Sequence, residues 1–374
     1  MGLNAIARHL RVAATMGLAV LLACGDAGSG RARAEGSEAG HGPLTKALDI
    51  EGKALLGSPP FEAPIGGALA SDGTILIADG SSLSIRVFSQ EGRLVRSVGR
   101  EGSGPGEFQS VPWARQCGRD SLFVWDPVAA RVSVVSKEGA IARDFRLPGN
   151  PALVECSRRG QFAVIMQPKD VRMPDPSGKA PRYRAPLLLV NAQGDSVGTL
   201  GDVPAYENRP MGKRTRVAVS ETAVFLGTQD SAFVHVYAPA GGAIGLLPIG
   251  SPGRRTTPEV YASAIEQMSR QLRISTERDA YKAFMLRIPM PELLPPYFEL
   301  FADGQGGVRA LTSLPGEGVT RLEGVAPDGA PLPTWSIEGD VKVFEIGEDY
   351  LLGSYEDAGD VPHIVLYKVG KAPT

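Results

Sequence analysis

Hydrophobic and polar positions along this chain form a repeated pattern of short strands separated by tight turns. Apolar or alternating runs such as Ile75–Asp79 and Val132–Val135 are followed by Asp-Gly, Glu-Gly or Gln-Gly pairs. These pairs are the residues that tight β-hairpins require, because they tolerate positive φ. The pattern therefore predicts many short antiparallel strands.

The pattern repeats with a period of 47 residues. Three pairs of equivalent residues are separated by this period: Phe61 and Phe108, Asp79 and Asp126, and Gly92 and Gly139. Gly194 and Gly241 repeat the same spacing within weaker units. Four strands in a unit of this length are typical of one blade of a β-propeller.

We therefore predict an all-β fold, a six-bladed β-propeller of four-stranded blades, with five or seven blades as the alternatives. The expected blades cover 65–99, 111–147, 152–200, 214–249, 297–337 and 341–369. The last unit lacks an outer strand after Val369, whereas Ala47–Gly57 supplies a spare strand before the first blade. Pairing the spare strand with the last blade would close the ring and remove two exposed sheet edges.

Two segments interrupt the propeller pattern. Gln167–Arg184 is rich in Pro and charge and predicts a long loop in the third blade. Thr257–Arg273 predicts one inserted helix, with Pro258 in its first turn and an apolar face that contains Val260 and Ile265. We expect this face to pack on the rim of the propeller; the alternative is a docking helix for a partner.

The first two units share a longer set of residues. They include Ile77-Ala78-Asp79, Val87-Phe88 and the connection Gly99–Phe108, which ends in Gly-Pro-Gly-Glu-Phe. Over residues 61–147 the chain resembles the NHL-type repeat of six-bladed β-propellers. The segment Gly102–Phe108 lacks the Gly-Lys-Ser/Thr ending of a phosphate loop, so we interpret it as a connection between blades with Phe108 inserted between the sheets.

The N-terminus has the layout of a signal peptide. Arg8 and Arg11 precede the uncharged run Val12–Ala23, which is too short to span a bilayer as a permanent helix. The order Leu21-Leu22-Ala23-Cys24 resembles the lipobox of bacterial lipoproteins, which implies a lipid on Cys24; the alternative is a secretory signal with an incidental Cys. Lipid attachment would hold the protein on a membrane outside the cytoplasm, on the periplasmic or surface face of the cell envelope.

These segments divide the chain into three parts. Residues 1–23 are predicted to be the signal peptide, 24–44 a Gly- and Ser-rich tether, and 45–374 the propeller. Loss of residues 1–23 removes two basic residues, so the net charge changes from -2 to about -4. Because no concentrated basic face remains, nucleic acid is not an expected partner, and we expect a monomer.

The chain offers little catalytic chemistry. After Cys24 the only histidines are His41, His235 and His363, and no zinc-binding Cys/His cluster or Gly-x-Ser-x-Gly motif is present. We therefore expect no catalytic residue, no metal and no cofactor. The alternative is a metal-dependent hydrolase or lyase at the channel, to which Asp79 and Asp126 would contribute carboxylates if they do not simply cap turns.

Cys117 and Cys156 both end the first strand of their predicted blades. Export would permit a disulfide between them. Equivalent positions on neighbouring blades can nevertheless be too far apart for a disulfide, so two buried thiols remain the alternative.

These observations predict an envelope propeller that binds a protein, peptide or glycan and is not an enzyme. A structural subunit of an envelope assembly is a further alternative. Propellers present loops around a central channel, and strand alternation turns some side chains of the second blade toward its axis. Candidate ligand-binding residues on its first two strands are Trp113, Arg115, Trp125 and Asp126.

Overall fold

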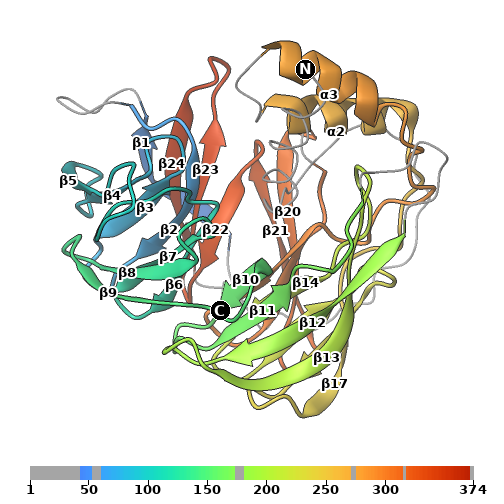
Figure 1. The fold of residues 1–374 in the computed structure, drawn as a ribbon, viewed down its shortest axis with the longest axis horizontal. Coiled ribbons are helices and arrows are strands. Elements are labelled where there is room, and N and C mark those ends of the chain that lie inside the picture. The colour runs from blue at the N-terminus through green and yellow to red at the C-terminus, as the bar shows by residue number, and fades with distance from the viewer. Residues whose placement is uncertain (1–42, 53–59, 173–180, 271–274, 315–316, 371–374) are drawn as a thin grey trace.

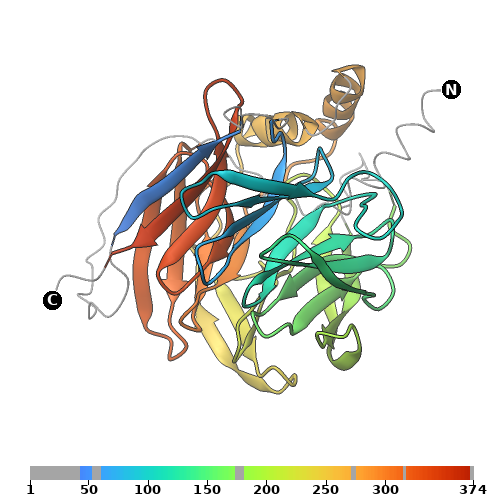
Figure 2. The same cartoon turned by 90° about the vertical axis from the view of Figure 1, so that its left-hand side faces the viewer.

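A computed structural model describes residues 43–52, 60–172, 181–270, 275–314 and 317–370. In these residues six antiparallel sheets of four strands are arranged in a ring (Figure 1; Figure 2). The predicted all-β, six-bladed propeller is confirmed. The predicted signal peptide, Cys24 and nearly all of the tether lie outside the described residues.

The first three blades follow the chain in order. Blade one consists of β2 (Pro64–Leu69), β3 (Ile75–Asp79), β4 (Ser84–Phe88) and β5 (Leu94–Val98). Blade two consists of β6 (Trp113–Gly118), β7 (Ser121–Asp126), β8 (Arg131–Ser136) and β9 (Ile141–Phe145). Blade three consists of β10 (Pro151–Cys156), β11 (Phe162–Met166), β12 (Arg182–Val190) and β13 (Ser196–Glu207).

The last three blades complete the ring. Blade four consists of β14 (Arg216–Val219), β15 (Val224–Gly227), β16 (Phe233–Tyr237) and β17 (Ala243–Pro248). Blade five consists of β18 (Glu299–Ala302), β19 (Val308–Leu311), β20 (Val319–Val325) and β21 (Pro331–Glu338). Blade six consists of β22 (Lys342–Ile346), β23 (Tyr350–Glu356), β24 (Pro362–Val369) and β1 (Leu44–Glu51).

Blade six is built from both ends of the chain. β1 pairs antiparallel with β24, from Leu44 opposite Val369 to Glu51 opposite His363 (Figure 2). Closure by an N-terminal strand is therefore confirmed. The strand begins at Leu44, three residues earlier than the predicted start at Ala47, because the available length of β24 extends the pairing in that direction.

Apolar contacts between neighbouring sheets form the core of the ring. Ala68 and Ile85 of blade one share a buried cluster with Leu122 and Val135 of blade two. Phe108, which is fully buried, lies in the same cluster, as expected for an inserted side chain. The connection before it is held by hydrogen bonds from Gly102 N to Phe108 O and from Phe108 N to Arg100 O, so Gly102–Phe108 forms a structured link between blades.

A disulfide joins Cys117 at the end of β6 to Cys156 at the end of β10. Their Cα atoms are 5.6 Å apart, within the range that a disulfide needs. Of the two alternatives left open by the sequence, the structure therefore contains the bond. It links the innermost strands of blades two and three, and the two cysteines are 39 residues apart in sequence.

Two helices are inserted between blades four and five, where the sequence predicted one. α2 (Pro258–Arg270) matches the prediction, and Thr257 Oγ1 accepts a hydrogen bond from Val260 N at its start. α3 (Ser275–Met285) was missed because its apolar residues, such as Tyr281 and Met285, are confined to its second half. Neither described helix is long and apolar enough to span a membrane.

The apolar face of α2 packs against the propeller, as predicted. Val260 and Ala264 share a buried cluster with residues of blades five and six. Met268 lines a small cavity together with Arg216, the first residue of β14. The helices therefore lie over the end of the ring at which the first strands begin (Figure 1).

Ring closure predicts different outcomes for two truncations of the mature protein. Removal of residues 24–42 leaves β1 intact and should not change the thermal midpoint. Removal of residues 24–51 also deletes β1 with its buried Ile50 and exposes the edge of β24. We expect aggregation, or a midpoint lower by about 10 °C or more, in calorimetry. An unchanged, cooperative melt of the longer truncation would contradict closure by β1.

Candidate functional site

A cavity of about 770 Å³ occupies one end of the central channel. It is lined by the ends of the first strands of all six blades and by the turns that follow them, at Leu69, Arg115, Glu155, Val219, Phe301 and Glu345 among others. These strands end there, whereas α2 and α3 lie at the opposite end of the ring. The cavity is thus the mouth of the channel on the face away from the helices.

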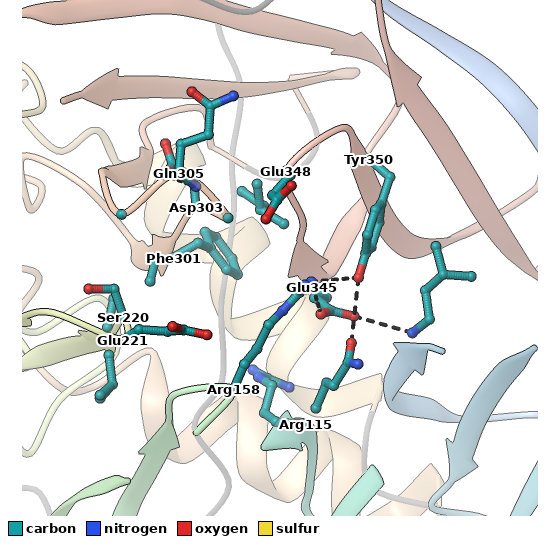
Figure 3. Close-up of a pocket in the computed structure, with 18 of the residues that line it drawn as sticks. Arg115, Arg158, Ser220, Glu221, Phe301, Asp303, Gln305, Glu345, Glu348 and Tyr350 are labelled. Atoms are coloured by element: carbon teal, nitrogen blue, oxygen red, sulfur yellow. Dashed lines mark hydrogen bonds and ion pairs between the residues drawn. The ribbon is translucent and has the colours of Figure 1, made fainter. Parts of the chain in front are cut away.

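An ion pair crosses the channel inside this cavity. Arg158, in the turn after β10, reaches Glu345 of β22 with an Nη2–Oε1 distance of 2.5 Å (Figure 3). Blades three and six are opposite each other in a ring of six, so this pair bridges the channel. The same Nη2 donates to the Tyr350 hydroxyl at 2.6 Å.

Two further blades take part in this network. The Tyr350 hydroxyl lies 3.5 Å from Gln116 Oε1 of blade two, and Leu69 N of blade one donates to Glu345 Oε2 at 3.3 Å. Burial raises the pKa of Glu345, while Arg158 opposes the rise. Burial and the Glu345 carboxylate raise the pKa of Tyr350, so Tyr350 stays protonated at physiological pH.

A second pair lies beside the first. Arg115 Nε is 3.7 Å from Glu155 Oε2, and both side chains are about one-fifth exposed, at 21% and 20%. Burial raises the pKa of Glu155 to about 7, with a further contribution from the Glu299 carboxylate. Arg115 opposes this rise, but Glu155 still titrates near neutral pH.

The rim of the cavity differs from its interior. Exposed carboxylates from two blades, Glu221 and Glu348, lie on it with Ser220 and Gln305, while Phe301 presents an aromatic ring from β18 (Figure 3). Glu221 also pairs with Arg159 at 2.7 Å. The cavity therefore offers carboxylates, guanidinium groups and the aromatic ring of Phe301, which suits a polar ligand with some apolar surface.

The structure places only one of the four predicted ligand-binding residues in this cavity. Arg115 lines it, whereas Trp113 and Trp125 lie directly opposite each other on β6 and β7 and pack in the cluster between blades two and three. Asp126 is fully buried and accepts hydrogen bonds from Gln109 N, Val128 N and Ala129 N. Ligand binding by these four residues remains a prediction, which the geometry favours for Arg115.

Asp79 of blade one is equivalent to Asp126 of blade two, and its carboxylate accepts similar backbone hydrogen bonds. Its Oδ1 accepts from Ala63 N and Ser81 N, and its Oδ2 lies 3.2 Å from Arg86 Nη2. Both carboxylates therefore hold a turn and the chain that enters their blade. Among the described residues, no group of three or more His, Cys, Asp or Glu side chains is placed to hold a metal ion.

Sequence reasoning missed Glu155, Arg158, Glu345 and Tyr350. Glu155 carried a usable signal, because it is the one charged residue in the otherwise apolar strand β10. No sequence signal marked Arg158 or Glu345, because 187 residues separate them and only closure of the ring brings their blades face to face.

Comparisons with known proteins support the fold. No protein-family model matches the chain, and no curated protein matches it. Among solved structures, a member of the DUF4221 family from Bacteroides vulgatus is similar over 89% of this chain and 99% of its own, with 12% identity and a TM-score of 0.53. This similarity shows a shared fold.

Two further solved structures resemble the chain less closely. A protein of Bacteroides fragilis described as exported is 12% identical, covers 88% of this chain and 95% of its own, and has a TM-score of 0.47. A virginiamycin B lyase from Staphylococcus aureus is 9% identical, covers 85% and 98%, and has a TM-score of 0.43.

The raised pKa of Glu155 predicts a pH-dependent stability. Because this pKa is about 7 in the folded protein and near 4.5 in the unfolded chain, folding takes up a proton between these values. The contribution of protonated Glu155 to the free energy of unfolding is fully present below pH 4.5 and is lost as pH rises through 7. Glu155→Gln should therefore raise the free energy of unfolding at pH 8 by about 1–3 kcal/mol and change it little at pH 4.5.

Denaturant unfolding at both pH values measures this difference. Glu348→Gln, at an exposed carboxylate on the rim, is the matched control and should leave the pH dependence unchanged. If Glu155→Gln and the unsubstituted protein lose stability equally between pH 4.5 and 8, Glu155 does not titrate as described.

Proposed function

We propose that this protein is an exported, lipid-anchored propeller of the bacterial cell envelope, which binds a protein, peptide or glycan partner in the channel cavity and does not catalyse a reaction. The observation that carries this proposal is the cavity of about 770 Å³ at the channel mouth. Its volume lies within the range of ligand pockets, and its lining comes from all six blades.

The chemistry of the cavity supports a binding role. Guanidinium, carboxylate, hydroxyl and aromatic groups converge in it, and they match the hydrogen-bonding groups of peptides and sugars. A partner's loop, a free peptide or a short glycan would have to enter the mouth to reach Arg115 and Arg158. The strands hold these side chains on a rigid ring, which lowers the entropy cost of binding.

Two independent features support export and anchoring. The signal-like run before Cys24 has the order of a lipobox. The Cys117–Cys156 disulfide suits an oxidising compartment outside the cytoplasm. We also propose that blades one and two are NHL-type repeats, since Asp79 and Asp126 make equivalent turn contacts.

Lipid anchoring predicts that Cys24→Ala removes the protein from the membrane. The variant loses the only proposed acyl attachment, and several acyl chains on one Cys are what would make membrane binding durable. Fractionation of cells followed by a salt wash measures the effect, and we expect most of the protein in the soluble fraction. A Cys24→Ala protein that stays in the washed membrane pellet would show that the anchor is elsewhere.

Binding in the cavity predicts that a partner can be cross-linked from one face only. A photoreactive phenylalanine analogue at Phe301 points into the cavity, and the same analogue at Ile244 lies on the outer strand β17, where Ile244 is 62% exposed. Illumination of cells should give a discrete adduct from position 301, identified by mass spectrometry as a peptide, protein or glycan. Benzophenone chemistry reports all three classes because it inserts into C–H bonds.

The control position decides the interpretation of these adducts. Ile244 should give no such adduct, because it faces away from the channel. The same species from both positions, or no adduct from position 301 in a protein that melts normally, would overturn binding in the cavity.

A further inference from the structure

The charged side chains that line the cavity are distributed unevenly around the ring. Blades four to six contribute five carboxylates to the lining: Glu221, Asp303, Glu345, Glu348 and Asp349. The cation that these blades add to the described lining is Lys368, which pairs with Asp349 at 3.3 Å. Blades two and three contribute Arg115, Arg119, Glu155 and Arg158. One side of the channel mouth is therefore acidic, and the other side is mainly basic.

Two of the five carboxylates on the acidic side, Asp303 and Glu348, form no ion pair with a described residue. The other three pair with Arg158, Arg159 and Lys368. Glu348 is exposed at the mouth, where a ligand can reach it directly. Negative charge that is not neutralised within the protein favours a partner of positive charge.

The turns that carry Asp303 and Glu348 touch each other. Gly304 N donates to Gly347 O at 3.4 Å, and a Cβ at Gly304 would collide with Glu348 N. Glycine at position 304 therefore lets the turns of blades five and six pack with no side chain between them. This contact holds the two carboxylates on the same side of the mouth.

Asp303 is buried but incompletely hydrogen-bonded. It is 5% exposed, and its Oδ1 accepts from Gln305 N at 3.1 Å and from Gly307 N at 2.7 Å, whereas its Oδ2 has no hydrogen-bond partner. Arg309 acts on this carboxylate only from beyond ion-pair distance, because its guanidinium lies over the Trp335 ring, 3.6 Å from the centroid. A buried acceptor left unpaired is costly, so a donor from a ligand would stabilise Asp303.

The ring of Phe301 adds an aromatic surface beside these carboxylates. Phe301 lies on β18, two residues before Asp303, and its ring lies between the turns of Glu221 and Glu348 in Figure 3. The face of an aromatic ring attracts a cation, and the attraction grows where water is partly excluded. Carboxylates around an accessible aromatic ring therefore favour an organic cation over a neutral ligand.

We propose that Phe301, Asp303 and Glu348 bind the ammonium group of a lysine or the guanidinium group of an arginine, so that the partner in the cavity is a basic peptide segment. The cation would donate a charge-assisted hydrogen bond to Asp303 Oδ2 and lie against the Phe301 ring. Glu348 would contribute a second, solvent-exposed negative charge.

This inference deepens the proposed function and rests on it, because it names the class of partner that enters the same cavity. Among the partners considered, a basic peptide carries the cationic group that this side of the mouth would bind. Glycans built from neutral or acidic sugars have no such group, so they count as an outcome against the inference.

The test begins with a phage-displayed library of random heptapeptides, selected on the immobilised, purified protein. We expect Lys and Arg to be enriched over the unselected library. A selected peptide is then labelled and titrated in fluorescence polarisation. Asp303→Asn keeps an Oδ1 acceptor for the turn but removes the charge, and it should weaken binding at least about 10-fold. Glu348→Gln, at an exposed position, should weaken it about 3-fold.

Three controls separate recognition of the cation from folding. Glu338→Gln removes an exposed carboxylate from β21, the outer strand of blade five, and should bind as the unsubstituted protein does. A peptide with norleucine in place of its basic residues should lose binding. Thermal melts identify the variants that fold, and the exposed position of Glu348 keeps the test decisive if Asp303→Asn does not fold.

Three results would each overturn the inference. They are a selection that yields no binding peptide, a selection without enrichment of basic residues, and an unchanged affinity in every substituted protein at positions 303 and 348 that folds.

Failure of this inference and failure of the proposed function give different results. Cross-linking from position 301 reports partners of any class, so an adduct with a glycan or an acidic protein, without selection of basic peptides, would reject the basic peptide alone. Basic peptides that depend on Asp303 and Glu348, without any adduct in cells, would reject the cellular partner while keeping the cation site.

Discussion

The pairing of β1 with β24 is the constraint on which the rest of the structure depends. It joins residues at opposite ends of the described chain, and it gives blade six its fourth strand. With blade six complete, every blade packs between two neighbours, and the exposed edges of an open array are avoided. Ile50 of β1 joins Ile75 of blade one and Leu352 of blade six in the apolar cluster between these two blades, so the closing strand also takes part in their packing.

Three ion pairs in the described channel join charges of different blades. Arg115 pairs with Glu155 of the next blade, Arg216 with Glu299 of the next, and Arg158 with Glu345 of the opposite one. Buried charges without partners are costly, so this matching helps to fix the order and spacing of the blades. The disulfide between Cys117 and Cys156 holds the strands that carry Arg115 and Glu155, and it acts at the same level of the channel.

Polar side chains gather at the channel mouth, and the two helices pack at the opposite end of the ring. α2 and α3 pack their apolar residues over the end at which the first strands begin. Short turns that carry Arg158, Glu221 and Glu348 form the channel mouth on the other face. Function in such a ring depends on a few turn and strand-end side chains, while the sheets serve as the support.

The sequence alone determined the blades, the closing strand and the first inserted helix, because these depend on local periodicity, turn residues and a repeat of 47 residues. It also marked Arg115, through its place on the first strand of blade two. Only the tertiary structure decided that Trp113 and Trp125 pack between blades, that the cysteines are bonded, and that Arg158 meets Glu345. Periodicity records which way a side chain points within its own strand, whereas contacts across the channel depend on how distant strands are placed when the ring closes.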